Sequence, residues 1–296
     1  MRMAVCVTTA VDPEERLEFL PGRGPSNLGA LRRELNRADA CALEEALRLK
    51  DRRRDLEVFA LSMGPASATD VLREALGQGA DGAVRLWDEA FAGSDALATA
   101  GLLATAARAL QADVVVCGER AMDGETGQVG IYMAEVLDLP VVTGVVRLEL
   151  TDDCEAIADQ RLERGLRRRV RCRLPALFTV EEGANRPRYP RLRSRLRAKH
   201  AVIPVWGVGE LGLEPDAVGQ AASRTAVIRL SPPKPTTKGI FVPDSELSAE
   251  ERLAQILSGG AGQRPAGGQR PAGPLTGSPA DQAREIARFL ADGKHL

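Results

Sequence analysis

Aromatic side chains are scarce in this sequence, and histidine is almost absent. Only 3% of the 296 residues are aromatic, and the two histidines are His200 and His295. With so few rings, base stacking on a nucleic acid is a poor expectation. Two distant histidines leave no credible zinc or haem site, and no Ser, His and Asp arrangement for nucleophilic catalysis is apparent. Any chemistry is therefore expected to come from a bound cofactor.

The sequence also lacks paired cysteines and long apolar runs. Its five cysteines are scattered without any C-x-x-C pair, and Cys6 and Cys117 lie in apolar strand-like runs. In such a run a thiol behaves as a small core residue. No run of about 18 apolar residues could cross a bilayer, and no signal-peptide segment precedes the first strand pattern. These features predict a cytoplasmic protein that is not membrane-embedded.

What is present is an alternation of strand and helix patterns through residue 146. Apolar runs predict strands at 3–7, 57–63, 83–87 and 114–117. Helical spacing predicts helices at 40–50, at 94–110 and at 129–136, and a further helix that follows the strand at 57–63 and ends at residue 76. The segment from 10 to 35 is irregular, with a loop at 21–25, and Asp39 is interpreted as an N-cap. The alternation predicts five βα-type units and an α/β fold with a parallel sheet.

Ligands bind parallel sheets at the carboxyl ends of the strands. The loops that follow Val7, Met63, Trp87 and Cys117 all leave their strands at this end. We therefore expect these four loops to converge on one site.

The stretch 112–140 is the most informative part of the chain. Its run at 114–117 indicates a strand buried on both faces, and Val129, Met133 and Val136 share one face of the next helix. The intervening DGETGQ segment offers two glycines, a capping hydroxyl at Thr126 and the free N–H groups of a helix start. Such a start suits a phosphate. However, any βα loop needs a cap and a glycine, and the segment matches neither G-x-G-x-x-G nor a Walker loop.

Residues 117–130 read CGERAMDGETGQVG, which resembles the CGRQAIDGDTAQVG signature in one branch of the electron-transfer flavoprotein beta subunits. The FAGSDALAT segment at 91–99 is similar to a FAGADTLAT segment found chiefly in members with a flavin in the beta subunit. Asn36 and Asp39 match an Asn-Pro-Phe-Asp motif. The resemblance covers about residues 1–260 and implies a Rossmann-like, adenine nucleotide alpha hydrolase-like sheet.

The resemblance also implies a ligand and the residues that hold it. In the family, the 117–130 segment holds AMP in simple members and a second FAD in electron-bifurcating members, and the 91–99 match favours FAD over AMP. The residues implied to contact the flavin and phosphates, or to line the nucleotide pocket, are Cys6, Asn36, Asp39, Met63, Asp95, Thr99, Cys117, Asp123, Gly124, Glu125, Thr126, Gly127, Gln128, Val129 and Gly130.

Beyond residue 150 the pattern changes to an antiparallel β extension at 155–180, with a turn at Arg164-Gly165. Residues 160–200 carry fourteen Lys or Arg against three Glu. A solvated hairpin or a docking surface for an acidic protein is favoured over a nucleic-acid patch, because aromatics are few and no recognition module is present. The resemblance implies a partner-recognition loop at 183–200, with Leu192 as the anchor for a docked dehydrogenase.

The sequence predicts a domain over 1–230 that binds a nucleotide or flavin and includes the antiparallel extension. A C-terminal arm is expected at 231–258, a flexible linker at 259–278 and a docking helix at 279–296. A lone helix on a tether is seldom stable unless it docks. It is expected to fold back on its own chain or, by family resemblance, to contact the flavin domain of an alpha subunit.

The resulting hypothesis is a beta subunit that binds FAD and forms a heterodimer with an alpha subunit carrying another flavin. It would pass electrons between a dehydrogenase or NADH and a downstream acceptor such as a quinone reductase. If the chain belongs to the bifurcating branch, its own flavin would accept a hydride from NADH and split the electron pair. The alternatives are a structural subunit that binds AMP and, less favoured, a basic nucleic-acid-binding module.

Overall fold

The computed structural model describes residues 1–19, 26–27 and 29–228. The expected loop at 21–25, the arm at 231–258, the linker at 259–278 and the helix at 279–296 lie outside the described residues. None of the described helices is both long and apolar enough to span a bilayer.

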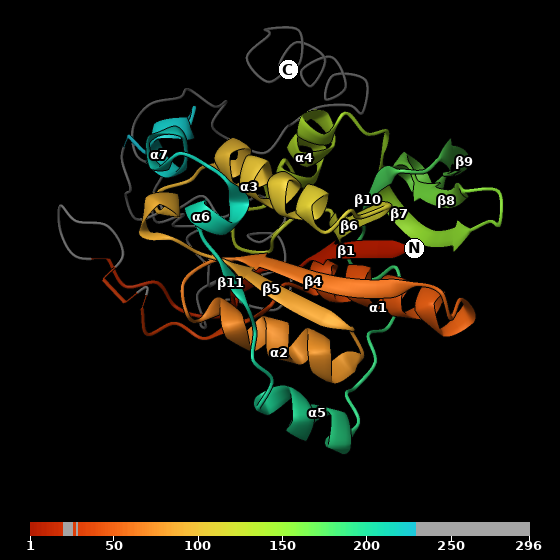
Figure 1. The fold of residues 1–296 in the computed structure, drawn as a ribbon, viewed down its shortest axis with the longest axis horizontal. Helices are drawn as coiled ribbons and strands as arrows, with labels where there is room; N and C mark the ends of the chain where they lie inside the picture. The colour runs from red at the N-terminus through yellow and green to blue at the C-terminus, as the bar shows by residue number, and fades with distance from the viewer. Residues whose placement is uncertain (20–25, 28, 229–296) are drawn as a thin grey trace, which may run out of the picture. The chain divides into compact units, whose positions relative to one another are not determined.

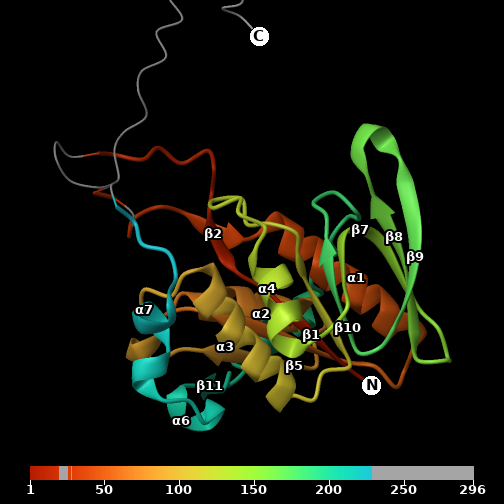
Figure 2. The ribbon, with the colours of Figure 1, turned by 90° about the horizontal axis from the view of Figure 1, so that it is seen from above.

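A nine-stranded sheet forms the centre of the described part (Figure 1). Its strand order is β11-β5-β4-β1-β6-β10-β7-β8-β9. The strands are β1 (Arg2–Cys6), β4 (Glu57–Met63), β5 (Gly82–Leu86), β6 (Val114–Gly118), β7 (Val141–Leu150), β8 (Glu155–Arg161), β9 (Arg167–Arg173), β10 (Ala176–Val180) and β11 (Val205–Trp206). The strands from β11 to β7 pair in parallel, and β8 and β9 continue the sheet as an antiparallel hairpin (Figure 2).

Two layers of helices cover the sheet because its central strands are apolar on both faces. In β1, Met3 and Val5 pack towards α1 and α2, whereas Ala4 and Cys6 pack towards α3 and α4. The longer helices are α1 (Arg37–Arg52), α2 (Ala68–Gln78), α3 (Ala96–Ala109), α4 (Val129–Leu137) and α5 (Leu192–Lys199). The short ones are η1 (Glu89–Phe91), η2 (Glu163–Gly165), α6 (Val208–Leu211), η3 (Pro215–Ala217) and α7 (Gly219–Ala222).

The predicted parallel sheet and antiparallel extension are confirmed, but one strand is placed differently. Residues 176–180 were expected to be antiparallel, yet β10 lies between β6 and β7 and runs parallel to both. All five of its residues are buried. Burial on both faces is typical of a central parallel strand, which explains the placement.

Three local expectations also need correction. The first helix begins at Arg37, with Asn36 at the N-cap position, so Asp39 lies within the first turn and is not the cap. Val136 is 39% exposed and does not share the buried face of Met133. The irregular segment contains a two-stranded antiparallel sheet, β2 (Thr9–Val11) with β3 (Arg33–Leu35).

The connection from β10 to α5 is tied to α1 by ion pairs. The Arg188 guanidinium lies 2.8 Å from a Glu44 carboxylate oxygen and 2.8 Å from one of Asp51. These two carboxylates hold the pKa of Arg188 well above its ordinary value. After this anchor the chain forms α5, which packs on α2 with Pro190 and Arg195 beside Gly77.

Candidate functional site

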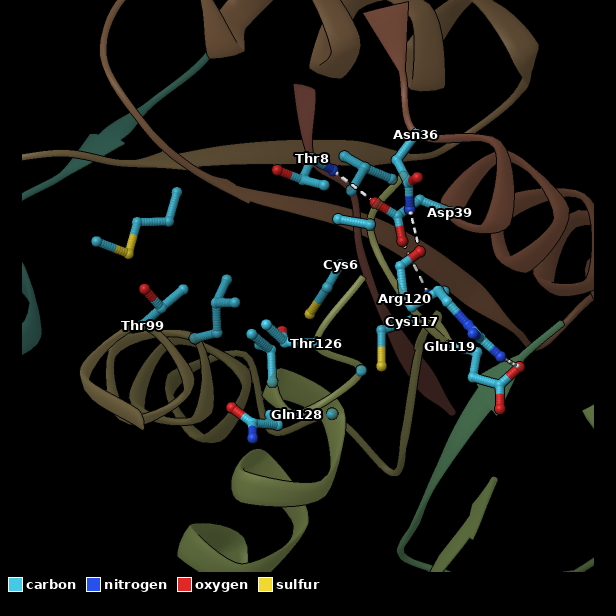
Figure 3. Close-up of a pocket in the computed structure, with 18 residues that line it drawn as sticks. Cys6, Thr8, Asn36, Asp39, Thr99, Cys117, Glu119, Arg120, Thr126 and Gln128 are labelled. Atoms are coloured by element: carbon cyan, nitrogen blue, oxygen red, sulfur yellow. Dashed lines mark hydrogen bonds and ion pairs between the residues drawn. The ribbon is translucent and has the colours of Figure 1, made fainter. Parts of the chain in front are cut away.

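A cleft of about 170 Å³ opens where β1, β4 and β6 end (Figure 3). Parallel strands end at the same edge of the sheet, so the chain segments that follow them meet there. Thr8 follows β1, Met63 ends β4, Gly118 ends β6, and residues 119–121 follow it. The loop directly after Trp87 does not line the cleft; Thr99 and Leu103 of α3 do so instead.

The buried carboxylate of Asp39 joins the ends of β1 and β6. It accepts a hydrogen bond from the Thr8 N–H at 2.8 Å and another from the Gly118 N–H at 2.9 Å. Burial raises the pKa of Asp39 to about 7, although these N–H groups act in the opposite direction. Asp39 therefore fixes the floor of the cleft instead of capping α1.

Asn36 holds the segment after β6. Its amide nitrogen donates to the Arg120 carbonyl oxygen at 3.0 Å, and its side-chain oxygen accepts from the Met122 N–H at 3.1 Å. The segment then turns back on itself, because the Glu125 N–H donates to the Ala121 carbonyl oxygen at 2.8 Å. Asp39 of α1 and the N-cap residue Asn36 thus position two strand ends, those of β1 and β6, and the loop that leads to α4.

The N-terminus of α4 opens into the cleft without a side-chain cap. Gln128 occupies the N-cap position and makes no capping hydrogen bond, so the expected capping role of Thr126 is wrong. Gly127 has φ of +61°, a left-handed conformation that glycine adopts without strain. Thr126, Gly127, Gln128 and Val129 all line the cleft. The first N–H groups of a helix carry partial positive charge, so this end of the cleft favours an anion.

Gly130 lets α4 approach the sheet closely. A Cβ atom at this position would lie 2.7 Å from Cys117 Sγ and 2.8 Å from Thr179 Cγ2. A Cβ atom at Gly118 would lie within van der Waals radii of the Asp39 carboxylate. Both glycines are therefore required by close contacts, one under the helix start and the other at the end of β6.

Two thiols line the cleft between these elements. Burial raises the pKa of Cys6 to about 12 and that of Cys117 above its ordinary range, and the Asp39 carboxylate adds to both effects. Both side chains are consequently neutral thiols near pH 7.

Most residues predicted to hold a cofactor are brought together here. Those that line the cleft are Cys6, Asn36, Asp39, Met63, Thr99, Cys117, Thr126, Gly127, Gln128, Val129 and Gly130. Those predicted that do not line it are Asp95, Asp123, Gly124 and Glu125. Sequence reasoning did not name Val7, Thr8, Leu103, Gly118, Glu119, Arg120 and Ala121, which also line it. Their position directly after β1 and β6, or one helical turn beyond Thr99, is the signal that could have found them.

The predicted residues outside the cleft have other partners. Asp95 caps α3 by accepting from the Ala98 N–H at 2.9 Å, and it also accepts from the N–H groups of Arg224 and Thr225. Asp123 accepts from the Val11 N–H at 3.3 Å, and Glu125 lines a neighbouring hollow beside Thr143. Leu192 begins α5, away from the cleft, and is 73% exposed.

Comparison with known proteins identifies relatives of this chain. Residues 29–211 match the family model for the electron transfer flavoprotein domain. Subunit CarD of the caffeyl-CoA reductase-Etf complex from Acetobacterium woodii is 38% identical over 235 residues, covering 79% of this chain and 88% of that protein. The electron transfer flavoprotein subunit beta of Thermoanaerobacterium thermosaccharolyticum is 36% identical over 76% of this chain and 85% of its own length. Protein FixA of Bradyrhizobium diazoefficiens is 38% identical, covering 75% of this chain and 80% of that protein.

Proposed function

The chain belongs to the family of electron transfer flavoprotein beta subunits, and from this membership we propose that it binds FAD in the cleft between β1, β6 and α4. The cleft is formed by residues from six elements (β1, β4, β6, α1, α3 and α4) and their loops, so the bound molecule would be held from several sides. AMP is the alternative ligand of the same cleft.

The start of α4 fits the phosphate groups of such a ligand. Its N–H groups have no side-chain cap, and Gly127 adopts a left-handed conformation beside them without a Cβ atom. Thr126 and Gln128 would add a hydroxyl and an amide as neutral donors. Asp39 takes no part in phosphate binding in this proposal, because both of its oxygens already accept backbone hydrogen bonds.

One observation favours FAD over AMP. Thr99 of α3 and Met63 of β4 line the same cleft as the α4 start and the Asn36 side. The cleft thus extends from the segment held by Asn36 to α3 on the other face of the sheet. A flavin and its ribityl chain would contact Thr99 and Met63 at that end. AMP has no flavin or ribityl chain to occupy that end of the cleft.

The flavin of FAD, when bound, supplies one- or two-electron transfer. This chain would hold it, limit its access to water and keep the neighbouring Cys6 and Cys117 as neutral thiols. In the proposed function, electrons come from a dehydrogenase or from NADH and leave through a flavin of the alpha subunit. The exposed Leu192 of α5 is proposed as a contact for a docked dehydrogenase.

A double variant tests the proposed site. Thr126 and Gln128 are exposed, and neither side chain caps α4, so Thr126→Val with Gln128→Ala should leave the fold intact. We expect the purified variant to retain less FAD than the wild type, because two donors at the phosphate end are lost. Glu163→Ala, in the β8–β9 turn, is the exposed control and should retain FAD normally. Wild-type nucleotide content in the double variant would contradict this placement of the phosphates.

A further inference from the structure

Three sulfur atoms lie together on the floor of the cleft. Cys6 of β1 and Cys117 of β6 are direct partners in the parallel register of these neighbouring strands. Partners of this kind project their side chains from the same face of the sheet, and both thiols line the cleft (Figure 3). From α4, the thioether sulfur of Met133 lies 3.8 Å from Cys6 Sγ.

The three residues of this sulfur cluster (Cys6, Cys117 and Met133) are buried. The three residues are 7%, 5% and 0% exposed, respectively. The Asp39 carboxylate also lines the cleft and accepts hydrogen bonds from the Thr8 and Gly118 N–H groups. Arg120 also lines the cleft, but its guanidinium lies 3.8 Å from the Glu119 carboxylate. A positive charge at the sulfur cluster would therefore be attracted by Asp39 and would meet no unpaired cation in the described cleft.

Sulfur donors select one class of ligand. Thiolates and thioethers prefer soft cations such as copper(I), whereas magnesium and calcium prefer oxygen. No three His, Cys, Asp or Glu side chains gather as a metal-binding group in the described chain, so a harder metal lacks its usual ligands here. Two thiols and a thioether match the requirements of a soft monovalent cation.

We propose that Cys6, Cys117 and Met133 form a binding site for a soft monovalent cation of the copper(I) or silver(I) class. Binding would replace one thiol proton, which leaves to the solvent, so the buried site would keep its overall charge. When no nucleotide fills the cleft, its open side gives the cation a route from the solvent to the sulfur atoms. The site depends only on residues of this chain and does not require that FAD is its cofactor.

Silver(I), which does not cycle between oxidation states under these conditions, is the probe. The full-length protein, in the complex in which it purifies, is freed of bound nucleotide, reduced, freed of reductant and mixed with silver nitrate in chloride-free buffer. Excess glutathione then removes silver held by single thiols, and the retained silver is counted after gel filtration. We expect the wild type to retain one silver ion per chain. The Cys6→Ser and Cys117→Ser variants should each retain none. Met133→Leu, which keeps the side-chain volume, should retain less silver than the wild type.

Two other thiols provide matched controls. Cys41 is also buried, but its sulfur contacts the Asn185 carbonyl oxygen at 3.7 Å, and Cys154 is exposed. Cys41→Ser and Cys154→Ser should retain as much silver as the wild type. The proposal is overturned if the wild type retains no silver against glutathione, or if only one of Cys6 and Cys117 matters.

A measurement on the wild type avoids dependence on the folding of the variants. X-ray absorption of the silver-loaded protein, after removal of glutathione, counts the sulfur neighbours of the metal. Two or three sulfur neighbours support the site, and a single one overturns it. Loss of silver binding would leave the FAD proposal intact, because nucleotide content is measured separately.

Discussion

At the scale of single residues, the Asp39 carboxylate joins two strand ends that are distant in the sequence. It accepts backbone hydrogen bonds from Thr8 and Gly118 and is buried beneath the cleft. A carboxylate in a dry site favours its protonated form. Its ionisation should therefore influence both the stability of the fold and the shape of the cleft floor.

The pH dependence of stability tests this role. Burial raises the pKa of Asp39 from 3.8 to about 7, so the folded state binds the proton more tightly than the unfolded state. This contribution to stability is complete below pH 3.8 and is lost as the pH rises to about 7. We expect the free energy of unfolding to fall across this window, by at most about 1.4 kcal/mol per pH unit from this group.

Asp39→Asn removes the ionisable group and keeps its size. Urea unfolding at a series of pH values should show a shallower decline for the variant than for the wild type across the same window. Equal slopes in the two proteins would contradict the assigned pKa of Asp39.

Gly130 gives a second prediction at the residue scale. An added methyl group would lie 2.7 Å from Cys117 Sγ and 2.8 Å from Thr179 Cγ2, both in the buried layer between α4 and the sheet. Gly130→Ala should therefore lower the free energy of unfolding by about 1–3 kcal/mol. In α3, a Cβ atom at Gly101 has no neighbour within 4 Å, so Gly101→Ala is the matched control.

The control substitution should be neutral or should stabilise the protein by up to about 1 kcal/mol, because alanine favours a helix. Denaturant midpoints of the two variants give the comparison. Equal stability of the two alanine variants would show that α4 does not approach the sheet as closely as described.

At the scale of elements, the start of α4 lacks the side-chain cap that was expected there. The sequence suggested a capping hydroxyl at Thr126, but the helix begins at Val129, and no side chain caps it. A missing cap normally costs about 1 kcal/mol. Its absence where the helix faces a cleft agrees with the proposal that a ligand phosphate completes the helix start.

The helix α5 carries a prediction of its own. Leu192 is 73% exposed at its first turn, and Arg193 and Arg197 border the same hollow. If this surface docks a dehydrogenase, Leu192→Ser should weaken that association by about tenfold, equivalent to about 1.4 kcal/mol. The dependence of flavin reduction on dehydrogenase concentration measures the effect.

A distant leucine controls for general surface effects. Leu166, in the β8–β9 turn, is 65% exposed, and Leu166→Ser should leave the association unchanged. Nucleotide content should be normal in both variants, because neither leucine lines the cleft. Equal effects of the two substitutions would argue against α5 as the docking element.

At the scale of the whole molecule, alternation of patterns predicted the parallel sheet but not its full order. β1, β4, β5 and β6 were identifiable because each apolar run is followed by a helical pattern. β10 lacks such a helix and follows an antiparallel hairpin, so its neighbours suggested the wrong direction. Only the pairing with β6 and β7 reveals that its two buried faces belong to the sheet centre.

The site was predictable to the extent that strand ends determine it. Cys6, Met63 and Cys117 line the cleft as expected because each lies at or near the carboxyl end of a parallel strand. Asp95 and Asp123 were placed by resemblance alone, and their carboxylates instead accept hydrogen bonds from residues 98, 224 and 225 and from Val11. The contact with Ala98 is a local N-cap, but Arg224, Thr225 and Val11 are far away in the sequence, so no local pattern could indicate those three partners.

The basic segment at 160–200 also separates into distinct surfaces. β9 belongs to the hairpin at one end of the sheet, whereas α5 packs on α2 (Figure 1). Several of its cations already have anionic partners, including Arg161 with Glu181 and Arg169 with Asp159. The segment therefore does not act as a single patch of free positive charge.

The nucleotide content of the complex with its alpha subunit tests the central proposal most directly. The protein is purified with that subunit, denatured, and its released FAD and AMP are counted per heterodimer. The account predicts two FAD and no AMP, because the cleft of this chain and the alpha subunit would each hold one flavin. One FAD with one AMP would contradict the proposed redox cofactor in this chain, and neither nucleotide would contradict the proposed site itself.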